Sequence, residues 1–198
     1  MSWQVEGYRT VRQLGDGATG RVVLAERDGN GTPVAIKYLS DDLRQDTHHL
    51  AAFRAEARLL SALQSPHVVR LWEYVEGPGG AAIVMELVDG VSLRAVLNDH
   101  GPTTPEAALC VLKGSLAGLG AAHGVGVVHR DYKPENVLVD TAGVSKLADF
   151  GIAVRSGRGA EVAGTPSYMA PEQWQGAPAS PTTAVSYTHL TLPTNREV

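Results

Sequence analysis

Short apolar runs separated by glycine-rich turns dominate the first forty residues. Residues 11–14, 22–26 and 34–39 are apolar or β-branched, and the turn Asp28-Gly29-Asn30-Gly31 separates the second run from the third. Runs of this length, bounded by turn residues, are typical of β-strands. The pattern therefore predicts three antiparallel strands.

A helical pattern follows from about residue 46. Its apolar positions form one stripe, made of Leu50, Phe53, Ala57 and Leu60. Ser65-Pro66 is expected to end this helix, because proline disfavours helical backbone in the residue before it. Two further strands are predicted at 68–75 and 81–87, joined by the turn Gly77-Pro78-Gly79-Gly80. A five-stranded antiparallel sheet with one helix results.

Beyond Asp89 the pattern becomes mainly helical, so a boundary between two lobes is expected near 86–89. Thr104-Pro105-Glu106 combines a candidate N-cap, a proline at the first helical position and an acid in the first turn. This helix should run to about residue 123 and end at Gly124. Its expected buried face consists of Leu109, Leu112, Leu116 and Leu119. Short segments around 127, at 137–139 and at 146–147 follow, separated by polar loops as in a loop-based active site.

Composition excludes several classes of protein. The chain has 198 residues, 43% of them hydrophobic, and a net charge of −4 at pH 7 with an isoelectric point near 6.0. This suits one large domain or two small lobes and provides no basic field for nucleic acid or anionic lipid. No apolar run approaches the ~20 residues that span a bilayer, and the N-terminus does not resemble an export signal. We therefore expect no membrane contact from this portion and a cytoplasmic location.

The single cysteine, Cys110, excludes an internal disulfide framework and suits a reducing compartment. It lies in the apolar helical pattern, so it is expected to be a buried core thiol.

Three glycines near the N-terminus fit the pattern G-x-G-x-x-G: Gly15, Gly17 and Gly20. A dinucleotide-binding fingerprint would need a helix after the glycines, whereas residues 21–25 continue as a strand. A glycine-rich turn between two strands can bring backbone amides close to phosphates. A plain hairpin turn remains the alternative interpretation.

Lys37 ends the apolar strand Val34-Ala35-Ile36-Lys37, and the following helix offers Glu56 as a counter-charge. An ion pair between them would hold the ammonium toward the α- and β-phosphates of a nucleotide. Taken alone, this strand end favours a surface lysine with its apolar stem packed on the sheet.

A more specific motif is His129-Arg130-Asp131-Tyr132-Lys133-Pro134-Glu135-Asn136. Asp131 can accept a hydroxyl proton, Lys133 can offset phosphate charge, and Asn136 can hold a metal. Asp149, in Asp149-Phe150-Gly151, adds the anionic oxygen ligand that Mg²⁺ prefers. Chance assembly of both motifs in this order is very improbable.

With these motifs and Ala170-Pro171-Glu172, the chain resembles the Hanks-type (eukaryotic-like) protein kinases, most closely the bacterial serine/threonine kinases, over residues 8 to about 183. The resemblance implies an α+β, two-lobe kinase fold with a five-stranded antiparallel sheet plus one helix in the N-lobe and a partial helical C-lobe. It implies ATP and Mg²⁺ or Mn²⁺ as cofactors, and proteins with serine or threonine acceptors as substrates.

The same resemblance assigns roles to individual residues. Lys37 and Glu56 would position phosphates, Asp131 would be the catalytic base assisted by Lys133, and Asn136 and Asp149 would bind the metal. Met85 would be the gatekeeper, 86–88 the hinge, and Val22, Ala35 and Leu138 the adenine contacts. The expected ATP-binding set is Leu14, Gly15, Gly17, Gly20, Val22, Ala35, Lys37, Met85, Glu86, Val88 and Leu138.

Two activation-segment residues, Thr165 and Glu172, complete the expected site. Lys133 together with Thr165 favours serine or threonine as the acceptor. Arg130 beside the base is typical of control by a phosphorylated activation segment. However, positions where many bacterial relatives carry threonines hold Gly157 and Gly159, which argues against control by autophosphorylation.

The C-terminal residues depart from the kinase pattern. The aspartate expected twelve residues after Glu172 is replaced by Ala184, and 185–194 shows no helical apolar period. One reverse translation of 185–194 resembles a transposase adapter used in sequencing libraries. We therefore expect an N-lobe at 8–88, a partial C-lobe at 89–183 and a non-native tail at 184–198. A genuine short tail is the alternative.

The predicted function is ATP-dependent phosphorylation of serine or threonine in proteins, although the chain as encoded is expected to be inactive because it is truncated. A kinase-like module that binds nucleotide or protein without catalysis is the alternative, and the intact Lys37, Asp131, Asn136 and Asp149 argue against it. A small-molecule phosphotransferase is disfavoured by Arg130 and the Ala-Pro-Glu segment. Many bacterial relatives carry a membrane span after the kinase domain, so the cytoplasmic expectation covers this portion alone.

Overall fold

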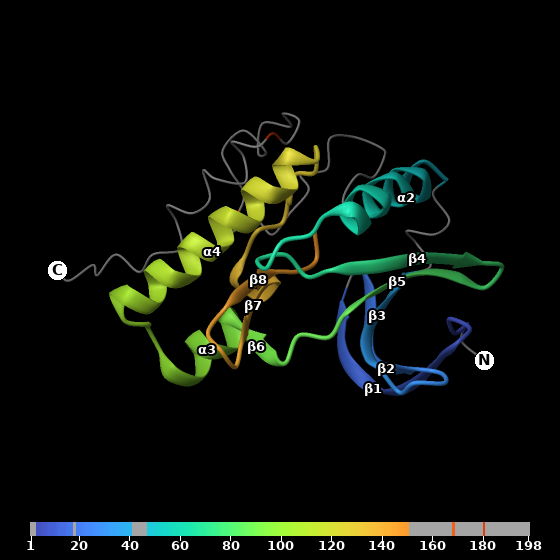
Figure 1. Ribbon diagram of the computed structural model, residues 1–198, viewed down its shortest axis with the longest axis horizontal. Coiled ribbons are helices and arrows are strands. Elements are labelled where there is room, and N and C mark those ends of the chain that lie inside the picture. Colours follow the sequence, from blue (N-terminus) through green and yellow to red (C-terminus); the bar gives the residue numbers. More distant parts are fainter. Residues whose placement is uncertain (1–2, 18, 41–46, 151–167, 169–179, 181–198) are drawn as a thin grey trace. The chain divides into compact units, whose positions relative to one another are not determined.

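The computed structural model describes residues 3–17, 19–40, 47–150, 168 and 180 (Figure 1). The chain divides into two compact units. The first consists of Met1–Gln64 and Val69–Leu87, and the second of Ser65–Val68 and Val88–Val198.

The first unit is built on a five-stranded antiparallel sheet in the order β1-β2-β3-β5-β4. Its strands are β1 (Tyr8–Gly17), β2 (Gly20–Arg27), β3 (Pro33–Leu39), β4 (Leu71–Gly77) and β5 (Gly80–Glu86). All five predicted strands are confirmed, including the Gly77–Gly80 turn, where Gly77 pairs with Gly80. β4 begins three residues later than predicted, because Val68 instead forms a bridge with Leu147 in the second unit.

The two faces of this sheet carry different side chains, as the alternation along a strand requires. From β3, Val34, Ile36 and Tyr38 enter an apolar core with Val5. Trp3 packs edge-on against Tyr38, with ring centroids 5.8 Å apart. The N-terminal residues thus cover one face of the sheet, which the sequence pattern did not predict.

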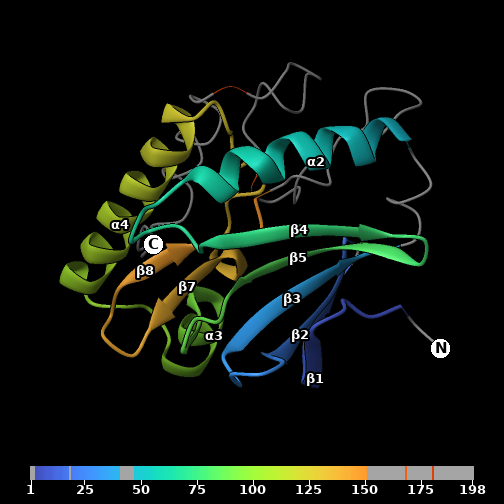
Figure 2. The ribbon, with the colours of Figure 1, turned by 45° about the vertical axis from the view of Figure 1, so that its right-hand side comes forward.

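The opposite face is covered by the helix α2 (Thr47–Ala62), which runs along β4 (Figure 2). Phe53 and Ala57 are buried as the apolar stripe predicted, and the Phe53 ring lies 5.5 Å from that of Tyr74 on β4. The helix ends at Ala62, three residues before the expected Ser65-Pro66 stop.

The second unit combines a small antiparallel sheet with helices. The sheet has the order β6-β7-β8, with β6 (Gly90–Ser92), β7 (Val137–Asp140) and β8 (Ser145–Leu147). The helices are α3 (Leu93–His100), α4 (Pro105–Gly124) and the 3₁₀ turn η1 (Pro134–Asn136). The sequence indicated β7 and β8 as short segments but gave no sign that β6 pairs with them.

The helix α4 begins as predicted and packs against β8. The Thr104 hydroxyl accepts a hydrogen bond from the amide of Ala107 at 3.3 Å, and Pro105 is the first helical residue. The helix includes Gly124, and the left-handed glycine after it is Gly126, with φ +81°.

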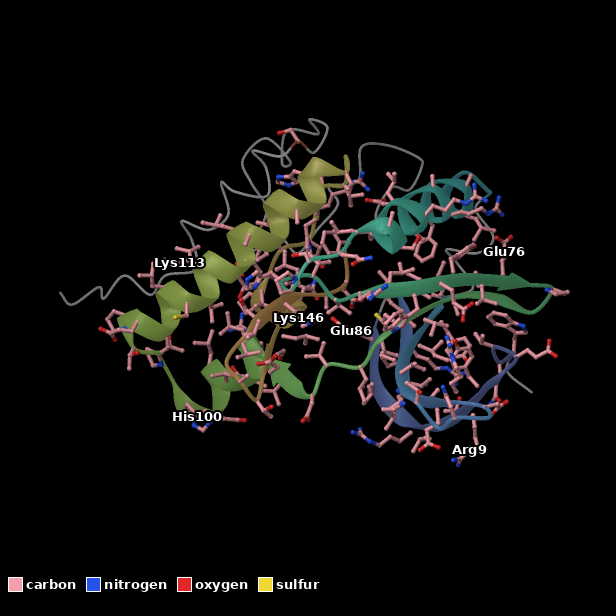
Figure 3. All side chains as sticks on the ribbon, in the orientation of Figure 1. Arg9, Glu76, Glu86, His100, Lys113 and Lys146 are labelled. Atoms are coloured by element: carbon pink, nitrogen blue, oxygen red, sulfur yellow. The ribbon has the colours of Figure 1, made fainter. Side chains whose placement is uncertain are left out.

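The predicted buried face of α4 is wrong for two of its four leucines. Leu109 and Leu116 are 49% and 40% exposed, and Lys113, which lies between them in the sequence, is exposed and projects outward (Figure 3). The buried residues are Gly114, Ser115, Gly118, Leu119 and Ala122. Small residues are required there because a Cβ at Gly118 would lie 2.4 Å from the backbone oxygen of His67, so a leucine does not fit.

Cys110 is exposed, which corrects the expected buried thiol. It lies near the start of α4, before the part of the helix that packs on the unit. Within the described residues, no helix is both long and apolar enough to cross a membrane.

Candidate active site

The loop between α4 and β7 places two predicted site residues, Lys133 and Asn136, around the carboxylate of a third, Asp131. Asp131 Oδ2 lies 2.7 Å from Lys133 Nζ and accepts a hydrogen bond from Asn136 Nδ2 at 3.2 Å. The same Nδ2 donates to the backbone oxygen of Asp131 at 2.8 Å. In the turn η1, the backbone amide of Asn136 donates a hydrogen bond to the Lys133 carbonyl. This turn brings Asn136 back onto Asp131. The spacing of the three residues in the motif therefore allows their side chains to contact one another in a single cluster.

These hydrogen bonds orient the Asn136 side chain. Its nitrogen is the donor in both contacts with Asp131, so the amide oxygen must point away from that residue. An oxygen donor is thereby presented on the side opposite the base. Oxygen ligands are those that Mg²⁺ prefers, so the Asn136 amide fits the metal-binding role predicted for it.

Asp149 is tied to the same loop through its neighbour Ala148. The Ala148 amide donates to the Asn136 carbonyl at 2.8 Å, and the Ala148 carbonyl accepts from His129 Nε2 at 3.0 Å. Asp149 and Arg130 adopt φ values of +50° and +61°, which residues other than glycine rarely do. Such strained backbone persists only where the surroundings impose it, and here it occurs beside Asp131 and at the second predicted metal ligand.

His129 is the buried centre of this arrangement. It is fully enclosed and its ring lies 4.5 Å from that of Phe150. Burial lowers the pKa of His129 to about 4, partly offset by its hydrogen bond to Ala148. The ring is thus neutral near pH 7 and carries its proton on Nε2. The sequence motif contained His129, but its positioning role depends on a contact with a residue nineteen positions away.

Within the first unit, the strand register places Lys37 in a row that crosses the sheet. Lys37 pairs with Val22 on one side and with Ile83 on the other, and Ile83 pairs with Tyr74. Directly opposed residues of antiparallel strands share a face, and Tyr74 contacts Phe53 of α2. Lys37 therefore lies on the sheet face that α2 covers.

Glu56 comes from this same helix. Lys37 and Glu56 are each only 8% exposed. A buried charge requires an opposite charge or hydrogen bonds, which argues against the alternative of a solvated surface lysine.

The glycine-rich segment is a hairpin turn between β1 and β2, with Gly17 paired to Gly20. The strand after it excludes the dinucleotide fingerprint, as predicted. Gly20 is required by packing, because its φ is +134° and a Cβ would lie 1.8 Å from the Tyr38 carbonyl oxygen. A Cβ at Gly15 or Gly17 would meet nothing within 4 Å, so packing does not explain those two glycines.

The other predicted nucleotide contacts are distributed over both units. In the first unit, Ala35 pairs with Met85, and Val34 with Glu86, while Leu14 is exposed on β1. The Glu86 carboxylate accepts from the Arg70 amide at 3.1 Å. Val88 and Leu138 belong to the second unit. Thr165 and Glu172 lie outside the described residues, as do Gly157, Gly159 and the tail at 184–198.

The donor set fits a magnesium ion that keeps phosphates among its ligands. No group of three or more histidine, cysteine, aspartate or glutamate side chains gathers in the described portion. Mg²⁺ is commonly held by one or two protein oxygens together with substrate phosphates. Asn136 and Asp149 provide such a minimal set.

The described residues thus form two units, and one loop with an aspartate, a lysine and an asparagine in contact is hydrogen-bonded to the segment that carries a second aspartate. The protein kinase domain family matches residues 8–186. The chain therefore belongs to the protein kinase family.

Several bacterial kinases resemble the chain. The chain is 42% identical over 181 residues to the serine/threonine-protein kinase pkn2 of Myxococcus xanthus, covering 86% of this chain and 22% of that protein. It is 41% identical over 184 residues to PkaB of Streptomyces coelicolor, covering 86% and 44%. It therefore spans less than half the length of these curated relatives. Among solved structures, a mutant form of the PknI kinase domain of Mycobacterium tuberculosis is 30% identical, with a TM-score of 0.76, covering 96% of this chain and 75% of that one.

Proposed function

We propose that this chain is the ATP-binding and catalytic portion of a serine/threonine protein kinase. The observation that carries the proposal is the cluster in which Lys133 and Asn136 both contact the Asp131 carboxylate. The bacterial kinases that resemble the chain over most of its length support the same activity. We place this portion in the cytoplasm, where ATP is available.

In the proposed reaction, the acceptor hydroxyl oxygen forms a bond to the γ-phosphorus of ATP, and the bond from that phosphorus to the β–γ bridging oxygen breaks. Asp131 accepts the hydroxyl proton, and ADP leaves. Lys133 lies close enough to Asp131 to offset negative charge on the transferred group. Phosphoryl transfer depends mainly on positioning and electrostatic stabilisation, because its transition state is loose.

The remaining predicted residues bind and orient the nucleotide. Asn136 and Asp149 would hold Mg²⁺, which when bound neutralises charge on the phosphates. Lys37, held by Glu56, would contact the α- and β-phosphates, and the amides near Gly15 and Gly17 would approach them without side-chain obstruction. Adenine would bind beside Val22, Ala35 and Leu138, with Met85 as gatekeeper. Thr165 and Lys133 favour serine or threonine acceptors.

Because the chain as encoded is expected to be inactive, the test uses an intact catalytic domain that carries this sequence and measures transfer of radiolabelled phosphate from γ-labelled ATP to a pool of serine and threonine peptides. Asp131→Asn should reduce transfer by about 10²-fold or more, the usual contribution of a positioned base, while stabilisation of the protein by ATP and Mg²⁺ is retained. Asp99→Asn changes an exposed aspartate of α3 and should leave transfer unchanged. Full transfer by Asp131→Asn would contradict the assigned role.

The same experiment distinguishes the binding-module alternative. If ATP and Mg²⁺ raise the melting temperature of the intact catalytic domain but no peptide or protein is phosphorylated, the domain binds nucleotide without catalysis. Lys37→Met should weaken the nucleotide-dependent stabilisation and nearly abolish transfer in an active enzyme. Transfer to a small molecule without transfer to protein would indicate the third class of function.

A further inference from the structure

Arg94, the second residue of α3, forms an ion pair with a residue of the catalytic loop. Its Nε donates to Glu135 Oε1 at 2.9 Å. The two side chains are 34% and 43% exposed, so the pair lies at the surface of the second unit. Neither residue is among the predicted site residues.

Arg94 also contacts a third segment. A terminal nitrogen of Arg94 donates to the Tyr168 hydroxyl, and its guanidinium carbon lies 5.9 Å from the centre of the tyrosine ring. In the sequence, Tyr168 lies between Gly164-Thr165-Pro166 and Ala170-Pro171-Glu172. One arginine of α3 thus contacts both the catalytic loop and Tyr168.

Glu135 has a distinctive place in the catalytic loop. It lies between Pro134 and Asn136, which are both buried, whereas Glu135 is exposed. The next residue, Asn136, donates a hydrogen bond to the carboxylate of Asp131, the proposed base. Glu135 is therefore one residue along the chain from a direct partner of that base. An acceptor chain that presents a hydroxyl to Asp131 must extend its neighbouring residues over the exposed surface nearby, at about 3.3 Å per residue.

An exposed carboxylate in this position would attract a basic residue of the acceptor. Arg94 already supplies that positive charge from within the chain. We propose that Arg94 is a specificity-determining residue, which occupies Glu135 and so removes a preference for arginine or lysine beside the phosphorylated serine or threonine. This inference rests on the proposed protein-kinase function and names the class of acceptor that the same site takes.

The test measures peptide binding, so it does not depend on turnover. Fluorescent serine-containing peptide pools carry either arginine or glutamine at one defined position, from four residues before the serine to four after it. Binding is measured by anisotropy for the unaltered chain, Arg94→Ala and Arg94→Ala/Glu135→Gln. Arg9→Ala is the matched control, because Arg9 forms an exposed ion pair with Glu26 on the sheet of the first unit (Figure 3).

Arg94→Ala should increase the ratio of arginine to glutamine affinity at one or more positions by about two- to fivefold, the range for a partly exposed ion pair. The double variant and Arg9→Ala should show the ratio of the unaltered chain. An unchanged ratio in Arg94→Ala, a gain that persists in the double variant, or no measurable binding of any pool would overturn the inference. If phosphate transfer is absent but the binding ratios are as expected, the result would contradict the proposed function and would leave this inference supported.

Discussion

Asn136 contacts Asp131 through its side chain and Ala148 through its backbone. Its amide nitrogen holds the Asp131 carboxylate and backbone, which leaves its oxygen directed elsewhere. Its own backbone oxygen accepts from Ala148, so the same residue links the loop of the base to Asp149. Substitution should therefore affect base orientation and metal binding together.

In an intact catalytic domain, Asn136→Ala should lower the transfer rate by about 10²- to 10³-fold, as for loss of one preorganised electrostatic contact, and should raise the Mg²⁺ concentration needed for half-maximal activity. The measurement is a magnesium titration of transfer at saturating ATP. Asn98→Ala, at an exposed position of α3, is the control. An unchanged magnesium requirement in Asn136→Ala would argue against metal binding by this residue.

His129 makes stability depend on pH. Its pKa in the folded protein, about 4, is below the unfolded value of 6.5, so between these values the unfolded chain binds more protons. Stability is therefore complete above about pH 6.5 and decreases as the pH falls toward 4. Between pH 7 and pH 5 the free energy of unfolding should fall by about 2 kcal/mol from this residue.

Urea denaturation of the chain at several pH values would measure this decrease. His129→Gln keeps a hydrogen-bond donor but does not titrate, so its decrease should be smaller by about the same 2 kcal/mol. Burial also lowers the pKa of His123, and comparison of the two proteins removes that contribution. Equal pH slopes would show that His129 does not titrate as its burial requires.

At the scale of the element, the packing of α4 depends on a glycine at a position where no side chain fits. Gly118 faces the backbone of His67 at a distance that excludes a Cβ, whereas a Cβ at Gly120, two residues later, meets nothing within 4 Å. The same substitution at these two sites should therefore have opposite effects. Helix propensity favours alanine at both positions, and only packing distinguishes them.

Gly118→Ala should destabilise the chain by about 1–3 kcal/mol, because the added carbon forces the backbone apart. Gly120→Ala should stabilise it by roughly 0.5–1 kcal/mol through helix propensity. Urea denaturation monitored by circular dichroism would measure both. Equal effects of the two variants would contradict the close approach of α4 to residue 67.

At the scale of the whole molecule, the segment Ser65–Val68 connects α2 to β4 but packs in the second unit. His67 Nδ1 donates to the Ser145 carbonyl at 3.0 Å, and the His67 carbonyl accepts from the Leu147 amide at 2.9 Å. A stretch of four residues inside the sequence of one unit thus contributes to the core of the other.

His67→Ala should cost about 1 kcal/mol, the net value of one hydrogen bond. The loss should appear as faster amide hydrogen exchange in β8 and α4, with β4 and β5 unaffected. His100→Ala, at the exposed end of α3, is the control and should change neither. Faster exchange in the first unit instead would contradict the assignment of this segment.

The features that the sequence predicted correctly depend on interactions between residues close together in the chain. Those that it predicted wrongly depend on residues far apart. Strands β1 to β5, the stripe of α2 and the Thr104 cap were predicted correctly, because hydrophobic alternation and capping act over a few residues. The burial of Leu109 and Leu116 was predicted wrongly. Helical spacing identifies an apolar face, but the approach of residue 67 decides which part of the helix is covered.

The candidate site likewise combines features that the sequence predicted with features that it did not. The sequence by itself determined the cluster around Asp131, because Asp131, Lys133 and Asn136 lie within six consecutive residues and the turn η1 closes them together. Only the tertiary structure decided the hydrogen bond of His129 to Ala148 and the pairing of Arg94 with Glu135. These contacts join residues 19 and 41 positions apart, and no local pattern specifies which distant segments the fold brings together.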